Sequence, residues 1–508
     1  MLPGSFARSR RNRSRIPVPQ PVERHHLAPD LEISRVVTGL WQVADMERQG
    51  DPVDLDACAA AMQAYYEAGL TTFDMADHYG SAEDIAGRWR RLQLRRASDA
   101  QLLTKWVPAP FPDSAPVSGD DVRAAVQRSL DRLHSDRIDL LQYHAWRFDD
   151  PRWLEHLWAL QELKREGRIR HIGLTNFDTA HLRIAVTSGI EIVSNQVCYS
   201  AIDNRAQGRM SEFCASHDIS LLAYGTLAGG FLSQRWLDQP EPDRDTLPTW
   251  SAMKYGRFIR AAGGWKAFQG VLRALHVVAA RHDASIPNVA CRYVLDQPAV
   301  AGIIVGARLG MSEHVSDNLR VFELRLDASD RVTIAEAGSA LTAIPGDCGD
   351  EYRRPPYLTA SGDLSHHVTE FAAPFDVRTG IDGRLIAMSG TPWETLAGFG
   401  RAVRVGNRIF VSGTTAAHRG TAISPSDPVA QTHFVIDKIA GALRSLGGQL
   451  DDVVRTRLYV RDLTHWEAVA RVHGERFAEV MPANTLVQGG LVGDEFLVEM
   501  EAEAIVAS

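Results

Sequence analysis

Residues 138–174 read IDLLQYHAWRFDDPRWLEHLWALQELKREGRIRHIGL. Ile138–Tyr143 and His171–Leu174 are short runs rich in apolar and β-branched side chains, whereas Pro151–Glu166 carries its apolar side chains at helical spacing. Strands of this length separated by a helix are typical of parallel β-sheets. The stretch therefore predicts one strand–helix–strand unit.

The same alternation continues on both sides of this unit, from residue 31 to about residue 340. It predicts eight strands: Ile33–Thr38, Thr71–Met75, Leu102–Lys105, Ile138–Tyr143, His171–Leu174, Ile192–Gln196, Ile219–Tyr224 and Gly302–Val305. Eight strands alternating with helices favour an α/β fold, a closed (β/α)8 TIM barrel over residues 29–340. An open doubly wound sheet is the alternative, but it would place a Gly-rich phosphate turn after the first strand. The sequence there is Gly39-Leu40-Trp41-Gln42, which is not that turn.

Composition excludes several classes of protein. The chain has 508 residues and a net charge of −8, which disfavours nucleic acid as its main partner. We find no apolar run long enough to cross a membrane, so we expect no membrane partner. Its 5 cysteines form no CxxC pair, so we expect neither a disulfide framework nor a metal site. This cysteine usage fits a reducing compartment and predicts a cytoplasmic location.

The remaining sequence divides into three segments. Residues 1–28 are rich in arginine and poor in acids, which predicts a disordered basic arm, with a transit peptide as the alternative. Residues 341–382 contain many Pro and Gly residues and are predicted to be a linker or a tail packed on the barrel. Residues 383–508 mix predicted strands with two helices, at Asp427–Leu446 and Thr464–Val480, and are expected to form a smaller α+β domain.

Four side chains with acid–base chemistry lie at or just after the ends of successive predicted barrel strands. Asp74 lies near the end of the second strand and Tyr79 follows it, Lys105 ends the third, and His144 follows the fourth. Loops at the strand ends of such a barrel converge on one mouth. A phenol with a nearby ammonium, a carboxylate that holds the ammonium, and an imidazole together suit proton donation to a carbonyl oxygen.

These residues resemble those of the aldo-keto reductases, and the resemblance covers about residues 31 to 335. The stretch FDMADHYGSAED matches the Asp/Tyr motif of that family, and Lys105 and His144 fall where the family keeps its Lys and His. The resemblance implies a catalytic tetrad. In it Tyr79 is the acid/base, Lys105 lowers the pKa of Tyr79, Asp74 pairs with Lys105, and His144 orients the carbonyl.

The resemblance also implies a site for NADPH, with NADH as the alternative. GLTNF places Thr175 and Asn176 at the nicotinamide carboxamide with Gln196 beside them, and Tyr224 stacks on the nicotinamide ring. Arg308 stands where a basic residue contacts the 2′-phosphate, although His314 replaces a second Arg found in many members. The cofactor residues so predicted are Gly39, Trp41, Thr175, Asn176, Gln196, Tyr224, Gly225, Leu227, Gly229, Gly306, Arg308, Asp317 and Asn318.

Four aromatic residues follow barrel strands and are predicted to form the walls of the substrate pocket: Trp41, Trp106, Trp146 and Phe231. The insertion 231–265 is long and rich in aromatic residues, which predicts a lid over the mouth of the barrel.

Residues from about 385 to 507 resemble the RidA/YjgF family. That resemblance implies a chorismate-mutase-like α+β fold, a homotrimer, and ligand clefts between subunits lined here by Phe399, Asn484 and Glu499. Asn484 stands where active imine deaminases of the family carry an Arg, and an amide cannot replace that cationic fork for a carboxylate. We therefore expect this domain to bind a ligand or to form the trimer rather than to deaminate.

Three functional hypotheses follow. The first is an NADPH-dependent reductase of a small aldehyde or ketone, fused to an oligomerising or ligand-binding module. The second is a reductase of C=N bonds, in which the second domain binds the imine or its precursor. The third is a sensor that binds NADPH without catalysis, which the intact set of Asp74, Tyr79, Lys105 and His144 argues against.

Overall fold

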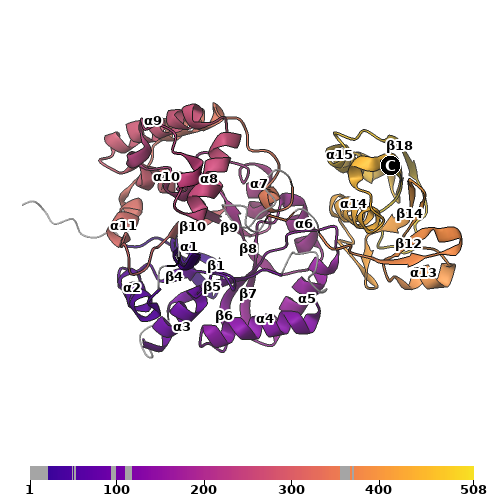
Figure 1. Cartoon of the computed structure of the whole chain (residues 1–508), viewed down its shortest axis with the longest axis horizontal. Helices are drawn as coiled ribbons and strands as arrows, with labels where there is room; N and C mark the ends of the chain where they lie inside the picture. The colour runs from indigo at the N-terminus through magenta and orange to yellow at the C-terminus, as the bar shows by residue number, and fades with distance from the viewer. Residues whose placement is uncertain are drawn as a thin grey trace, which may run out of the picture.

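The computed structural model describes residues 21–48, 50, 53–92, 99–108, 117–354, 367–368 and 371–507. It consists of a barrel and a smaller C-terminal unit beside it (Figure 1). Most of the predicted basic arm, residues 1–20, lies outside the described residues. Arg24–Ala28, at the end of that arm, form strand β1, so the prediction of disorder is wrong for this part.

The barrel has eight parallel strands, as predicted. The last strand pairs with the first, Ile303 beside Val36, and this pairing closes the sheet and rules out the open doubly wound alternative. In barrel order the strands are β3 (Val36–Gly39), β4 (Thr72–Asp74), β5 (Gln101–Trp106), β6 (Ile138–Tyr143), β7 (Ile169–Thr175), β8 (Ile192–Cys198), β9 (Ser220–Tyr224) and β10 (Val300–Gly306).

A β-hairpin lies at the amino ends of the barrel strands. It is formed by β1 and β2 (Leu31–Ser34), and Leu31 and Ile33 pack with Leu103 and Leu222 of the barrel interior. The predicted first strand, Ile33–Thr38, is therefore two strands, β2 and β3. The break falls at Arg35, whose guanidinium donates to the carbonyls of Val300 and Ala301 on β10 and of Leu295 on α10.

Helices surround the barrel because their apolar faces pack against the outer face of the sheet. Their first turns carry the expected caps: Ser118 and Asp121 form a capping box on α4, and Ser285 and Asn288 form another on α10. The helices are α1 (Trp41–Arg48), α2 (Leu55–Glu67), α3 (Ala82–Leu92), α4 (Gly119–Arg132), α5 (Arg152–Arg165), α6 (Thr179–Thr187), α7 (Arg209–Ser216), α8 (Trp250–Ala261), α9 (Trp265–Arg281), α10 (Ile286–Leu295), α11 (Val315–Glu323) and α12 (Ala328–Ser339).

The C-terminal unit is a mixed sheet with two long helices on one face, which confirms the predicted α+β class. The pair β17–β18 is parallel, and the other pairs are antiparallel. In sheet order the strands are β11 (Asp376–Thr379), β12 (Leu385–Met388), β13 (Ala402–Val405), β14 (Arg408–Thr415), β19 (Val498–Ile505), β17 (Val453–Val460) and β18 (Ala483–Gln488). Strand β11 belongs to this sheet although it lies in the segment predicted to be a linker. Two short strands, β15 (Ala417–His418) and β16 (Thr421–Ala422), and the short helix α13 (Pro392–Ala397) complete the unit.

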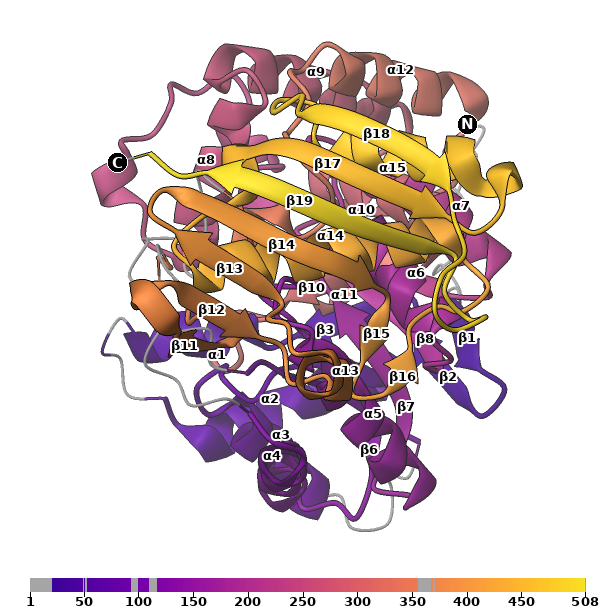
Figure 2. The same ribbon diagram turned by 90° about the vertical axis from the view of Figure 1, so that its right-hand side faces the viewer.

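Helix α14 (Pro428–Ser445) lies between the sheet of the C-terminal unit and the barrel (Figure 2). It packs against the sheet and against barrel helix α6, while α15 (Trp466–Arg476) lies beside it. Gly441 of α14 is close to the carbonyl of Asp149, where a Cβ would lie 2.2 Å from that oxygen. The opposite face of the sheet is open in the single chain.

Candidate active site

A cavity of about 1010 Å³ opens at the carboxyl ends of the barrel strands. The four predicted tetrad residues line it, and so do all the predicted cofactor residues, from Gly39 on β3 to Asn318 on α11. Each tetrad residue comes from the end of a strand or from the loop after it, where loops of a (β/α)8 barrel converge. The fold therefore brings together residues that are far apart in the sequence.

Asp74 and Lys105 form a buried ion pair at the base of the cavity. Lys105 Nζ lies 2.5 Å from Asp74 Oδ2 and also donates to the carbonyl of Met75. Gln142 and Gln196 donate to the second oxygen, Asp74 Oδ1, at 2.9 and 2.8 Å. Burial lowers the pKa of Lys105, and the Asp74 carboxylate offsets this in part.

Tyr79 lies above this pair. Lys105 Nζ is 5.0 Å from the centre of the Tyr79 ring, and Trp41 contacts the same ring edge-on. Burial, followed by the charge of Asp74, raises the pKa of Tyr79 well above its ordinary value. This direction differs from the lowering by Lys105 that the resemblance implies. It keeps Tyr79 in the phenol form, the form that can donate a proton.

His144 follows β6, and it is buried and faces the cavity. Burial, followed by the positive charge of Arg353, lowers the pKa of His144 well below its ordinary value. The imidazole is therefore neutral, with one nitrogen as a hydrogen-bond donor and the other as an acceptor. Its Nε2 lies 3.5 Å from the side-chain amide of Asn176.

The end of β7 provides the predicted carboxamide site. Asn176 has a φ of 56°, and Tyr224 Oη donates to its Oδ1 at 2.7 Å. Thr175 Oγ1 is buried and has no hydrogen-bond partner in the described part of the chain. An unsatisfied buried hydroxyl fits a bound amide, because an amide supplies both a donor and an acceptor. Gln196 pairs with Thr175 across β7 and β8 and lines the cavity beside it, and its amide nitrogen is bonded to Asp74 and Gln142.

The loop after β9 carries glycines that suit the close approach of a phosphate group. Gly225 and Gly229 have φ values of 71° and 63°, in the left-handed region that glycine adopts without strain. A Cβ on Gly229 would lie 2.7 Å from the carbonyl of Ser251 on α8. Arg308 and Asp317 also line the cavity, and Asn288 donates to the carbonyl of Asp317.

Trp41, Trp146 and Phe231 line the cavity as predicted, but Trp106 does not. Side chains alternate along a strand, so Trp106 points away from the cavity that its neighbour Lys105 faces. The ring of Trp106 instead packs on Tyr143 and His156, at 5.4 and 5.3 Å between centroids. The prediction that Trp106 forms a wall of the pocket is wrong for this reason.

The segment 231–265 forms part of the cavity wall. It contains α8, whose first residue, Trp250, stacks on Trp41 at 5.7 Å. Trp41 Nε1 donates to Ser251 Oγ at 3.1 Å, so the segment is joined to the mouth of the barrel. This placement is the one expected of a lid.

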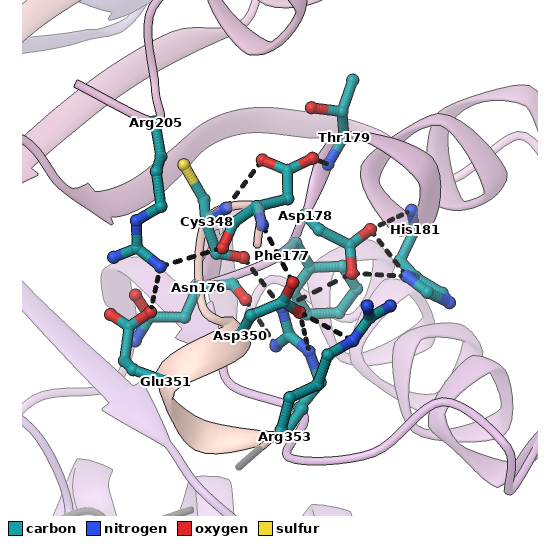
Figure 3. A network of polar contacts seen from close by, with 12 residues as sticks. Asn176, Phe177, Asp178, Thr179, His181, Arg205, Cys348, Asp350, Glu351 and Arg353 are labelled. Carbon is teal, nitrogen blue, oxygen red and sulfur yellow. Dashed lines mark hydrogen bonds and ion pairs between the residues drawn. The ribbon is translucent and has the colours of Figure 1, made fainter. Parts of the chain in front are cut away.

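The segment that follows the barrel adds residues that sequence reasoning missed. Glu351 and Tyr352 lie in the short 3-10 helix η4 (Asp350–Tyr352), and Tyr352 lines the cavity. Arg353 donates to the carbonyl of Asn176 at 2.7 Å, and Glu351 is joined to Arg205 at 2.8 Å (Figure 3). The Pro- and Gly-rich composition gave no signal for this role beyond the prediction of a tail packed on the barrel.

Within one chain Phe399 and Glu499 both lie near Arg401, whereas Asn484 is bonded on the other side of β17. Asn484 pairs with Thr456 along β17 and β18, and its amide donates to Thr456 Oγ1 at 2.8 Å. Glu499 lies opposite Tyr459, on the other side of β17 and further along it. Burial raises the pKa of Glu499. The third residue, Phe399, lies under the guanidinium of Arg401, at 5.4 Å from ring centre to Cζ.

Among the described residues, no group of His, Cys, Asp and Glu side chains has an arrangement that could hold a metal ion. No described helix has both the length and the apolar character needed to cross a membrane.

A (β/α)8 barrel with an Asp–Tyr–Lys–His set at its mouth defines a class of oxidoreductases. Residues 35–338 match the model of the aldo/keto reductase family, and this chain belongs to that family. Residues 390–506 match the family model described as endoribonuclease L-PSP. The two matches confirm the resemblances to aldo-keto reductases and to RidA/YjgF proteins.

Individual relatives resemble one part of the chain or the other. The NADH-specific methylglyoxal reductase of Escherichia coli is 25% identical over 61% of this chain and 97% of its own length. The holo form of an aldo-keto reductase from Bacillus halodurans is 25% identical over 63% of this chain and 97% of its own, with a TM-score of 0.48. Rv2704 of Mycobacterium tuberculosis, a YjgF/YER057c/UK114 member, is 38% identical over 24% of this chain and 99% of its own, with a TM-score of 0.23.

Proposed function

We propose that this enzyme reduces a small aldehyde or ketone with NADPH. The observation that carries the proposal is the convergence of Asp74, Tyr79, Lys105 and His144 on one cavity that also contains the unsatisfied hydroxyl of Thr175. A bound nicotinamide would supply the hydride. Thr175 and Asn176 would hold its carboxamide, and the Tyr224 ring would fix one of its faces.

The proton comes from the chain itself. Tyr79, a phenol at neutral pH, donates its proton to the carbonyl oxygen as the hydride reaches the carbon. Neutral His144 donates a hydrogen bond to the same oxygen and orients the carbonyl. The ammonium of Lys105, held by Asp74, stabilises the phenolate that remains on Tyr79.

The test is the oxidation of NADPH by the full-length chain, followed by absorbance. The panel pairs aldehydes and ketones with cyclic imines, and Tyr79→Phe is the control. Turnover of carbonyls that is lost in the control supports the proposal. A preference for imines would replace it with a C=N reductase, and binding of NADPH without turnover would replace it with a sensor.

We propose NADPH rather than NADH because Arg308 lines the cavity and its guanidinium suits a phosphate. The name of the Escherichia coli relative states a preference for NADH in that protein. Measuring kcat/KM for both cofactors decides between them.

For the C-terminal domain we propose assembly into a homotrimer rather than deamination. The open face of its sheet exposes Phe410, Val454 and Ile505, at 39%, 43% and 45%, beside charged residues. Contact with further copies of this chain would cover these side chains. The amide of Asn484 is bonded to Thr456 and supplies no fixed cation for a carboxylate. Light scattering tests the trimer, and a monomeric mass would contradict it.

We also keep the cytoplasm as the proposed location, since all the cysteines are buried free thiols, which suits a reducing compartment.

A further inference from the structure

A lysine of the lid segment enters the catalytic cavity. Lys254 lies on α8 and is surrounded by aromatic rings of three different segments. Its Nζ is 5.0 Å from the ring centre of Tyr224 and 4.8 Å from that of Tyr352, and it is 5.7 and 5.8 Å from those of Tyr255 and Phe258. Lys254 is half-buried, and these rings separate much of its side chain from bulk water.

The hydrogen bonding of Lys254 is incomplete. Nζ donates to Tyr352 Oη at 2.8 Å, yet an ammonium has three hydrogens to donate. No carboxylate of the described residues lies within ion-pair distance, 4.0 Å, of Nζ. A cation in low-dielectric surroundings is strongly stabilised by an anion in direct contact with it.

Glu351, the carboxylate whose charge acts on Lys254, is already engaged. Glu351 Oε2 binds Arg205 at 2.8 Å (Figure 3). Glu351 Oε1 lies 3.2 Å from Tyr224 Oη. Burial would raise the pKa of Glu351, but Arg205 and Lys254 lower it to about 2. Burial would likewise lower the pKa of Lys254, but Tyr352 and Glu351 raise it. Lys254 therefore stays charged while Glu351 faces another cation.

Lys254 is also next to the reacting groups. The ring of Tyr352 contacts the His144 ring edge-on at 4.8 Å and the Trp146 ring at 5.4 Å. One phenol ring thus separates the ammonium from the imidazole that would orient the carbonyl. An anion bound by Lys254 would belong to a molecule that reaches the catalytic centre.

We propose that Lys254 Nζ and Tyr352 Oη form a subsite for a carboxylate of the substrate, so that the substrates are aldehydes or ketones that carry a carboxylate. This inference rests on the proposed reductase function and names its substrate class. The segment that follows the barrel supplies Tyr352, and the lid segment supplies Lys254. The carboxylate subsite therefore exists only when both segments pack on the barrel.

The experiment compares two aldehydes of nearly equal shape, 4-carboxybenzaldehyde and methyl 4-formylbenzoate, with saturating NADPH and the full-length chain. We expect kcat/KM to be at least about tenfold higher for the acid, the size of one charge-assisted hydrogen bond. Lys254→Met should bring the ratio of acid to ester close to 1, mainly through the KM of the acid. Lys254→Arg should restore most of the preference, and Tyr352→Phe should lose part of it.

The control variant is Arg235→Met. Arg235 is a second cation of the cavity wall, stacked on Trp236, and its removal should leave the acid/ester ratio unchanged. Thermal unfolding of each variant separates loss of fold from loss of the subsite.

Three results would overturn the inference. A wild-type ratio near 1, or a ratio unchanged in Lys254→Met, shows that the reductase function holds without this subsite. A tenfold weaker Kd for NADPH in Lys254→Met, with the acid/ester ratio kept, assigns Lys254 to a cofactor phosphate. If the wild type reduces neither aldehyde nor any other carbonyl of the panel, the proposed function fails first, and the inference falls with it.

Discussion

His181 Nε2, on barrel helix α6, lies 2.8 Å from Asp437 Oδ2 on helix α14 of the C-terminal domain. The other ring nitrogen of His181 lies 2.6 Å from Asp178 Oδ1, and Asp178 also binds Arg353. Arg353 donates to the carbonyl of Asn176, and Figure 3 shows the contacts from His181 through Asp178 and Arg353 to Asn176. Together with the contact to Asp437, these bonds join the second domain to the predicted carboxamide site. The two domains are thus connected at the wall of the active site.

The contribution of this contact between the domains to the free energy of unfolding should depend on pH. Burial would lower the pKa of His181, but Asp178 and Asp437 raise it above 6.5. The contribution of His181 to the free energy of unfolding is therefore complete below pH 6.5, and it is lost as the pH rises through the pKa of His181 in the folded protein. Burial would raise the pKa of Asp437, but Arg476 and His181 lower it from 3.8 to about 2, so its contribution is lost as pH falls towards 2. The His181–Asp437 pair therefore stabilises the folded protein most between about pH 4 and 6.5.

His181→Leu tests this window. We expect it to lower the free energy of unfolding by about 3–5 kcal/mol at pH 5.5, because it leaves two buried carboxylates without their shared cation. The loss should shrink as the pH rises through the raised pKa of His181, because the wild-type imidazole then becomes neutral. Urea unfolding over a pH series from 5.5 upward measures it, and a loss that does not change with pH would contradict the charged state of His181.

Tyr79→Phe should reduce kcat by about 10²- to 10⁴-fold, the usual contribution of a general acid. The ring contact with Trp41 is kept in this variant, so the Kd for NADPH should change little. Single-turnover oxidation of NADPH and quenching of tryptophan fluorescence measure the two effects. Unimpaired turnover would remove Tyr79 from the mechanism.

Lys105→Met should destabilise the barrel as well as stop catalysis. Asp74 would remain buried without its cation, at a cost of about 3–5 kcal/mol. The double variant Asp74→Asn/Lys105→Met should recover much of this stability but none of the activity. Urea unfolding of the wild type, Lys105→Met, Asp74→Asn and the double variant gives the coupling. A coupling near zero would show that the ion pair contributes no stability.

Arg308→Ala should change the choice of cofactor. We expect the KM for NADPH to rise at least tenfold, because a charge-assisted contact with the 2′-phosphate is lost. The KM for NADH, which lacks this phosphate, should stay within about threefold. Initial rates with each cofactor measure this, and an equal effect on both would place Arg308 away from the 2′-phosphate.

The barrel strands and the positions of the tetrad could be predicted from the sequence, because they depend on local patterns. Apolar runs such as Ile138–Tyr143 recur at the spacing of a strand–helix repeat, and the closed barrel follows from their number. Asp74, Tyr79, Lys105 and His144 reach the same cavity because parallel strands all end at one face.

The face of the sheet to which a given side chain points was harder to predict. Trp106 comes directly after Lys105, yet it faces His156 outside the cavity because successive side chains point to opposite sides. The break at Arg35 was missed for a similar reason. An arginine that satisfies three distant carbonyls looks, in the sequence, like any polar residue beside a strand.

The tertiary structure alone decided how the segments outside the barrel repeat complete the site. Lys254 and Tyr352 are 98 residues apart and share no pattern, yet they meet at 2.8 Å. The same holds for His181 and Asp437, which are 256 residues apart. Local patterns of apolar and polar residues determine strands, helices and their order, because these depend on near neighbours in the chain. Contacts between distant segments depend on how whole elements pack, and no local pattern encodes that.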